Sequence, residues 1–265
     1  MKFTMLMLLN ILFEIAFSQN TVTTIEQRIS PKKDKLLFHD MGNKNYKRKW
    51  FLDGKRAKVI NSVEGMLFEA GEEYGNDSSH AVLWTKKSFN GNILVEFDYT
   101  RTDTTTRCVN IIYLHATGTG TKEYPKDIRN WKEKREVPKM KYYFNNMHAY
   151  HISYAAFDAI KYSGENDYIR LRQYDPALQK LDGTEILPDA FTTGMFKPFI
   201  TYHIEITLFN NLLVMKIVNK EKPTEQLVCK WNLRNKPHLS AGRIGLRHMY
   251  TRNALYKDFK VWEIL

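Results

Sequence analysis

Short segments rich in β-branched and aromatic residues recur along the chain, and most of them are bounded by Gly, Asn, Asp or Pro. This pattern is typical of β-strands joined by tight turns. Helical periodicity is limited to short turns near residues 127–134 and 176–180. Strands are expected at residues 36–40, 65–71, 81–89, 92–100, 107–116, 149–157, 167–174, 202–210, 212–219, 226–233 and 243–250.

About eleven strands with almost no helix predict an all-β fold, in which two antiparallel sheets pack face to face as a β-sandwich of the jelly-roll type. The chain has 265 residues, and β-sandwiches of this length often form one unit. The sequence shows neither a solenoid-length repeat nor an interdomain linker. We therefore expect a polar leader at residues 19–35 and a single jelly-roll domain at residues 36–265.

The segment DYIRLRQYDP, residues 167–176, places two arginines in one expected strand. Because strand side chains alternate, Arg170 and Arg172 leave the same face as Tyr168 and Tyr174, and the aliphatic residues between them enter the core. Arginine pairs on an outer face suit carboxylate or sulfate groups, to which their planar forks donate parallel hydrogen bonds. The alternative is a pair of surface arginines that contributes little.

Histidines stand beside Tyr, Ser and Arg in three other expected strands. For any one of them a structural role is the more common one, and it is the recurrence that favours a site. In residues 149–157, His151 and Ser153 share a face, and in residues 107–116, Tyr113 and His115 do. In residues 243–250, Arg247 and His248 point to opposite faces, and Tyr250 ends the segment.

Together these residue types suit β-elimination on a uronic acid. An arginine neutralises the carboxylate, a His or Tyr removes the C5 proton, and another hydroxyl assists the group that leaves C4. We expect Arg170 and Arg172 to bind the carboxylate or a sulfate, with His151 as the base and Tyr174 as the acid. Further substrate-binding candidates are Tyr113, His115, Arg247, His248 and Tyr250. Loss of a glycosidic oxygen would define a polysaccharide lyase, and loss of a hydroxyl a dehydratase.

Hydrolysis, the competing chemistry, requires two well-placed carboxylates. Sandwich-fold glycosidases resembling laminarinases carry E-x-D-x-x-E on one strand, whereas VEFDYTR offers Glu96 and Asp98 followed by Arg101. Glu96 and Asp98 are thus expected to be outward-facing polar residues of an ordinary strand. The sequence contains no H-E-x-x-H and no paired C-x-x-C, so no metal or cofactor is predicted, and a structural calcium ion has no motif to support it.

The chain is basic, with 40 Lys and Arg against 29 Asp and Glu and a net charge of +11. Such an excess attracts polyanions, and the alternative is a solvated surface that keeps the protein in solution. The sequence has two cysteines, Cys108 and Cys229. Both lie in apolar strand-like segments, where either a disulfide bond or two buried free thiols is compatible with the pattern.

Residues 1–18 have the pattern of a signal peptide. Lys2 precedes an apolar run that is too short to span a bilayer comfortably, and Ala16 and Ser18 precede a cleavage position. A buried N-terminal helix is the alternative, because Glu14 interrupts the run. We expect a secreted or periplasmic protein without membrane insertion, and export argues against nucleic acid as the partner.

Several segments resemble the YesU-like family of bacterial proteins of unknown function. They are W-F-L-D-G, EGMLFEAG, AVLWTKKSFNGNILVEFDYTRTD, YHISYAA, YIRLRQYDP, CKWN and GRIGLRHMYTRNALYKDFKVWE. The resemblance implies a galectin-like or concanavalin-like jelly roll and a role in the breakdown of acidic polysaccharide such as pectic rhamnogalacturonan or ulvan. The alginate-lyase motifs R-[ST]-E-[LV]-R and Q-[IV]-H are absent from the sequence, so no catalytic residue is transferred by motif.

The main hypothesis is an eliminase that acts on uronate-containing, sulfated or pectic poly- or oligosaccharides. A non-catalytic carbohydrate-binding protein on the same fold is the alternative, because the same Tyr and Arg residues would serve both. A third hypothesis is an obligate partner of another exported enzyme. The sequence predicts no oligomeric state.

Overall fold

The structure is a computed structural model that describes residues 31–157 and 167–265. The expected signal peptide, most of the expected leader and residues 158–166 lie outside the described residues. The strands are β1 (Lys33–Asp40), β2 (Trp50–Asp53), β3 (Lys58–Ser62), β4 (Gly65–Glu69), β5 (Ala81–Asn90), β6 (Ile93–Arg101), β7 (Cys108–Gly118), β8 (Met147–Phe157), β9 (Asp167–Gln173), β10 (Glu185–Phe191), β11 (Thr201–Phe209), β12 (Leu212–Asn219), β13 (Gln226–Asn232), β14 (Ala241–His248) and β15 (Asn253–Ile264).

Helical segments are short. Single 3₁₀ turns occupy η1 (Tyr46–Arg48), η2 (Asp77–Ser79) and η4 (Pro176–Leu178), a longer 3₁₀ segment forms η3 (Ile128–Arg135), and the α-helix is α2 (Met140–Asn146). The expected turns near residues 127–134 and 176–180 are η3 and η4. None of the helices in the described part of the chain is long and apolar enough to cross a membrane.

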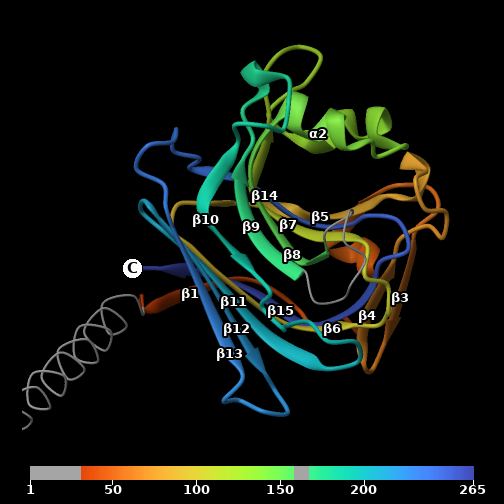
Figure 1. Cartoon of the computed structure of the whole chain (residues 1–265). Coiled ribbons are helices and arrows are strands. Elements are labelled where there is room, and N and C mark those ends of the chain that lie inside the picture. Colours follow the sequence, from red (N-terminus) through yellow and green to blue (C-terminus); the bar gives the residue numbers. More distant parts are fainter. Residues whose placement is uncertain (1–30, 158–166) are drawn as a thin grey trace, which may run out of the picture.

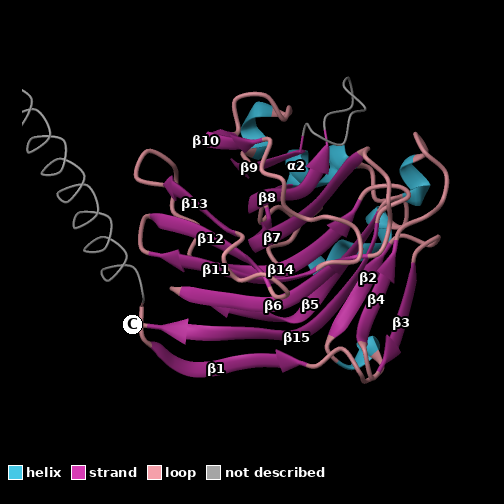
Figure 2. Ribbon diagram, turned by 60° about the horizontal axis from the view of Figure 1, so that its bottom comes forward, coloured by secondary structure: helices cyan, strands magenta, loops and turns pink. Residues whose placement is uncertain are grey.

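The strands form two antiparallel sheets that face each other, so the predicted β-sandwich jelly roll is confirmed (Figure 1). The eight-stranded sheet has the order β13-β12-β11-β6-β15-β4-β3, and β1 also pairs with β15. The long β15 uses different halves for different neighbours, with β4 on its first four residues and β1 on its last six, as Figure 2 shows. The seven-stranded sheet has the order β10-β9-β8-β7-β14-β5-β2.

The main core lies between the sheets and follows from strand alternation. Ile152 of β8 and Leu171 of β9 point inward from the seven-stranded sheet and meet residues such as Phe97 of β6 from the other sheet. Side chains at alternating positions of β9 therefore point to the core and to the outer face in turn, as predicted. Ile169 and Leu171 are buried in this core, and the arginines between and after them leave the opposite face.

A second apolar cluster covers the outer face of the seven-stranded sheet, the face turned away from the eight-stranded sheet. Here η3 and α2 pack on the strands, and Figure 1 shows α2 above β7, β8 and β9. The rings of Trp84, Tyr113 and Tyr143 lie nearly parallel, with Trp84 and Tyr113 5.3 Å apart and Tyr113 and Tyr143 6.1 Å apart. Gly245 makes room for this stack, because a Cβ at residue 245 would lie 2.4 Å from the Trp84 ring.

One buried carboxylate fastens this covering segment to the sheet. Asp53, at the end of β2, accepts hydrogen bonds from the Trp84 indole at 2.8 Å, the Arg135 guanidinium at 2.6 Å and the Tyr143 hydroxyl at 3.0 Å. Arg135 and Asp53 are both fully buried. The W-F-L-D-G segment thus supplies the anchor that holds η3 and α2 over the outer face.

The cysteines are free thiols, and they stand in different sheets, Cys108 in β7 and Cys229 in β13. Burial raises the pKa of each thiol to about 11. Of the two arrangements compatible with the sequence, the structure therefore shows the unpaired one.

Candidate functional site

Two adjoining rows of residues cross the outer face of the seven-stranded sheet. One row, running from β9 to β14, is Arg170, Ser153, Ile111 and Arg247. The next row, running from β9 to β5, is Arg172, His151, Tyr113, Gly245 and Trp84. Strand pairing therefore brings together five of the predicted residues, which come from four separate strands.

His151 lies at the centre of a buried chain of hydrogen bonds. Its Nδ1 is 2.7 Å from the Tyr174 hydroxyl and its Nε2 is 2.8 Å from Ser153 Oγ, and the hydroxyls of Tyr174 and Tyr113 are 3.3 Å apart. Burial, followed by the charges of Arg172 and Arg247, lowers the pKa of His151 well below its ordinary value. Burial raises the pKa of Tyr174 well above its ordinary value. At neutral pH this pair is an uncharged imidazole and a protonated hydroxyl.

Arg170 and Arg172 have carboxylate partners within the protein. Arg170 Nη2 is 2.6 Å from Asp189 Oδ2, and Arg172 Nη1 forms an ion pair with Glu185 and donates to the Leu181 carbonyl at 3.0 Å. Both carboxylates belong to β10, which pairs with β9. The arginines lie on the predicted face, but much of their hydrogen-bonding capacity is used inside the protein.

Arg170 is the more accessible of the two. Its side chain is 26% exposed, and its guanidinium lies 5.1 Å from the centre of the Tyr168 ring. The Phe191 side chain, 63% exposed, packs beside the same ring at 6.5 Å. A ligand from solvent therefore meets a partly exposed arginine that lies against the Tyr168 ring, with the exposed Phe191 beside that ring.

Three predicted residues lie outside the two rows. His248 points into the core, opposite Arg247, where its ring stacks on Phe68 at 4.4 Å and its Nε2 is 2.8 Å from the Tyr256 hydroxyl. His115 lies in a β-bulge with φ of 49° and donates from Nδ1 to the Leu239 carbonyl at 2.7 Å. Tyr250 follows β14 and is half-buried.

These placements do not support His115 and His248 as part of one site with His151. For His248 the alternation of the strand is the reason, because adjacent residues point to opposite faces. For His115 the bulge is the reason, because it ends the simple alternation after Leu114. Tyr250 stays close, since its ring is 4.3 Å from that of His80, which contacts Arg247.

Sequence reasoning did not single out His80. Its Nδ1 accepts a hydrogen bond of 2.8 Å from Arg247 Nη2. Burial, followed by the charge of Arg247, lowers the pKa of His80 to about 3. It is the C-cap residue that ends the 3₁₀ turn η2, directly before an apolar strand, and no sequence signal distinguished it from an ordinary turn residue.

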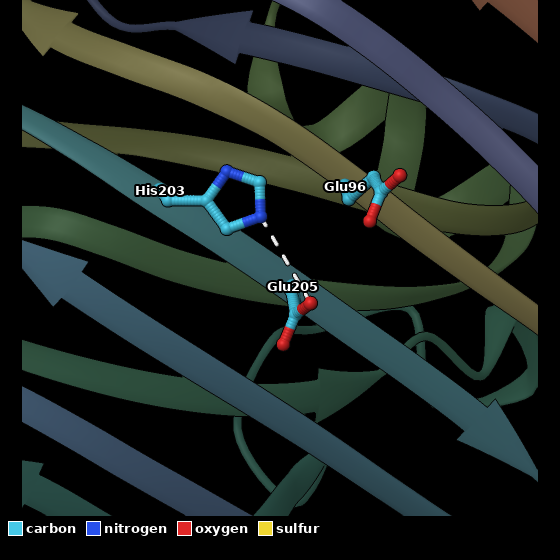
Figure 3. Close-up of side chains that lie close together, drawn as sticks. All are labelled: Glu96, His203 and Glu205. Carbon is cyan, nitrogen blue, oxygen red and sulfur yellow. Dashed lines mark ion pairs between the residues drawn. The ribbon is translucent and has the colours of Figure 1, made fainter. Parts of the chain in front are cut away.

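A cluster of metal-ligand type lies on the opposite side of the molecule, on the outer face of the eight-stranded sheet. Its members are Glu96, His203 and Glu205, whose side chains Figure 3 shows over β6 and β11. Glu96 already accepts hydrogen bonds from the Lys33 amine at 2.6 Å and the Trp262 indole at 2.9 Å. Because the Lys33 ammonium group already pairs with the Glu96 carboxylate, the arrangement is that of a surface ion-pair network. Glu96 faces outward, as predicted.

A surface depression of about 750 Å³ lies at the edge formed by β3, β4 and β15. Its charged lining residues pair with one another, as in the contact between Arg56 and Glu73 and that between Lys58 and Glu72 at 3.6 Å. None of the predicted site residues lines it. The chemistry that the sequence indicates therefore lies on the outer face of the seven-stranded sheet and not in this depression.

Comparison with known proteins supports the fold. A protein of unknown function with a galectin-like fold from Bacillus subtilis superposes with a TM-score of 0.64 at 16% identity, covering 89% of this chain and 99% of that one. The VIP36 lumenal domain bound to Ca²⁺ and Man3GlcNAc superposes with a TM-score of 0.54 at 11% identity, covering 88% of this chain and 93% of that one. The lectin UEA-II complexed with galactose superposes with a TM-score of 0.53 at 8% identity, covering 88% of this chain and 100% of that one.

At these identities the likenesses show a shared fold. No curated protein matches the sequence significantly. Residues 35–261 match the family described as a domain of unknown function (DUF1961), and the chain belongs to this family.

Proposed function

We propose that this protein binds carbohydrate through the outer face of the seven-stranded sheet. The observation that carries the proposal is the meeting of Arg170, Arg172, His151, Tyr113 and Arg247 in two adjoining rows of that face. Tyr and Arg side chains offer flat surfaces and directional hydrogen bonds, which suit a ligand rich in hydroxyls. The fold shared with a galactose-bound lectin and with a Man3GlcNAc-bound lumenal domain supports the same class of ligand.

The ligand we propose is an acidic oligosaccharide, either uronate-containing or sulfated. The net charge of +11 favours polyanions over neutral sugars. Arg170, which stacks on Tyr168 and is partly exposed, stands where such a ligand would make its first contact. The resemblance to the YesU-like family and the expected export signal agree with a ligand met outside the cytoplasm.

Isothermal titration at fixed ionic strength, with pectic, ulvan-derived and neutral oligosaccharides, tests the proposal. We expect one acidic class to bind, and Arg170→Ala to weaken that binding by about tenfold, the usual effect of one charge-assisted hydrogen bond. Lys230→Ala is the control, because Lys230 is an exposed cation on β13 of the other sheet. Absence of binding to all oligosaccharides, or equal losses in the two variants, would contradict the proposal.

Elimination is the second candidate, and the contact between His151 and Tyr174 at 2.7 Å is what favours it. The predicted base and acid meet beside Arg172, although both are buried, so that a substrate would have to displace their cover. Formation of a C4–C5 double bond would give a rise in ultraviolet absorbance, and His151→Ala should abolish it. Mass analysis would then separate chain cleavage from loss of water. Binding of an oligosaccharide without a rise in absorbance would exclude elimination and retain only the carbohydrate-binding function.

A further inference from the structure

Arg247 differs from the other buried arginines of the described residues in one respect. Its side chain is fully buried, and it forms no ion pair with a described carboxylate. Each of the other five has one: Arg101 and Arg252 with Asp103, Arg135 with Asp53, Arg172 with Glu185, and Arg243 with Asp127. A guanidinium stays charged in proteins, so Arg247 is a buried cation that no described carboxylate balances.

The contacts that Arg247 does make are neutral. Its Nη2 donates to the Pro138 carbonyl at 2.7 Å and to His80 Nδ1 at 2.8 Å. Because a guanidinium can only donate, Nδ1 must accept, so His80 is the neutral imidazole with its hydrogen on Nε2. The low pKa of His80, which follows from burial and from the charge of Arg247, agrees with that form. Neither partner supplies negative charge.

Two of the three guanidinium nitrogens, Nε and Nη1, make no hydrogen bond of regular geometry among the described residues. The Tyr113 hydroxyl is a further polar neighbour of the guanidinium, and it too is neutral. The Tyr143 ring, whose centre is 4.6 Å from Cζ, offers a partial cation–π contact. Unsatisfied donors on a buried charge are costly, so their presence calls for an explanation, and a bound ligand that completes them is one. The atoms that are lacking are acceptors, preferably negatively charged ones.

We propose that Arg247 is the receptor for an oxyanion of the ligand, a carboxylate or a sulfate ester, and this inference rests on the proposed carbohydrate-binding function. Both oxyanions accept parallel hydrogen bonds from a guanidinium. Ser153 lies in the same row as Arg247, with Ile111 between them, and supplies a hydroxyl on the side facing Arg170. The two arginines would then hold an acidic chain at two points.

Access to Arg247 requires a side chain to move, because Arg247 is fully buried. Met140, at the start of α2, is half-buried and lies 3.9 Å from the Tyr113 hydroxyl and 4.0 Å from that of Tyr174. It is unbranched and therefore adapts readily. Entry beside Met140 would leave the anchor of the covering segment at Asp53 intact.

Titration of wild type, Arg247→Met, Arg247→Lys and Arg243→Met with galacturonate oligomers, their methyl esters and sulfated oligomers at fixed ionic strength tests the inference. We expect Arg247→Met to lower affinity for the charged oligomers by about 10- to 100-fold and to leave affinity for the esters unchanged. Arg247→Lys should lie between, since it keeps the charge without the fork. Arg243→Met should bind as wild type does, because Arg243 is already paired with Asp127.

Urea unfolding of the unliganded variants adds a second readout. A receptor arginine costs stability in the free protein, so Arg247→Met should be as stable as wild type or more stable, whereas Arg243→Met should be less stable. Unchanged affinity for charged oligomers in Arg247→Met, or marked destabilisation of both Arg247 variants, would overturn the inference. Comparison of the galacturonate oligomers with the sulfated oligomers shows whether the bound oxyanion is a carboxylate or a sulfate ester.

The two proposals fail in different ways. Tight binding of charged and esterified oligomers alike, unaffected by Arg247→Met, would keep carbohydrate binding and remove the oxyanion receptor. Binding of inorganic sulfate that depends on Arg247, with no binding of any oligosaccharide, would keep the receptor and remove the carbohydrate.

Discussion

His151 and His248 illustrate how single residues of one type acquire different roles in this sheet. Both are buried, and burial lowers the pKa of each, that of His248 to about 3. His151 is hydrogen-bonded on the outer face to Tyr174, whereas His248 is hydrogen-bonded in the core to Tyr256. Residue type and burial alone do not separate a candidate base from a core residue; the face of the sheet to which the side chain points does.

His248 makes stability depend on acid. The unfolded state takes up a proton near pH 6.5, but the folded state resists protonation down to about pH 3. The contribution of a neutral His248 is therefore complete above pH 6.5 and falls by about 1.4 kcal/mol for each pH unit below it. We expect the free energy of unfolding of wild type, measured with urea, to fall more steeply between pH 6.5 and pH 4 than that of His248→Gln. Parallel pH profiles would contradict this.

At the scale of elements, the covering segment decides what the outer face can do. Without η3 and α2 the rows of the seven-stranded sheet would form an open surface, but Trp84, Tyr113, Tyr143 and Tyr174 are buried beneath or within the segment. The segment contains little regular helix, and it is held on the sheet by side-chain packing and by the Asp53 hydrogen bonds. It therefore converts a set of surface side chains into a buried polar cluster.

Asp53→Asn tests that anchor. The substitution leaves the buried Arg135 without its anion, and we expect a loss of about 3–5 kcal/mol in the free energy of unfolding. Asp182→Asn, which changes an exposed carboxylate, should cost less than about 0.5 kcal/mol. Urea unfolding measures both. A loss of less than about 1 kcal/mol in Asp53→Asn would show that packing alone holds the segment.

At the scale of the whole molecule, the described fold is held by two sheets and their core, without a covalent link between its cysteines. Cys108 and Cys229 belong to different sheets and remain thiols. The burial that raises the pKa of each to about 11 also keeps thiolate scarce at neutral pH.

The thiols give a direct test of this arrangement. We expect a reducing agent to leave the melting temperature unchanged within about 1 °C, and an alkylating reagent to modify the folded protein slowly and the urea-unfolded protein quickly at both cysteines. A fall in melting temperature on reduction, or fewer than two reactive thiols in urea, would show that a disulfide forms.

Much of the fold could be predicted from the sequence because alternation is a local property of an extended chain. The eleven expected strands are all present, and the divided faces of β8 and β9 follow from residue order. The sequence pattern did not predict β2, β3, β10 or β15. β3 is short and half exposed, and β10 contains Pro188 and lies at a sheet edge, where proline is tolerated.

The site was predicted in part, for the same reason. By itself the sequence determined the β-sandwich and the outward direction of Arg170, Arg172 and His151. Only the tertiary structure decided that Asp189 and Glu185 pair with the arginines and that Arg247 is buried beneath residues 138–143 without a described anion. Alternation depends on neighbours in the chain, whereas these contacts depend on strand order, a β-bulge and a covering segment more than 100 residues from Arg247.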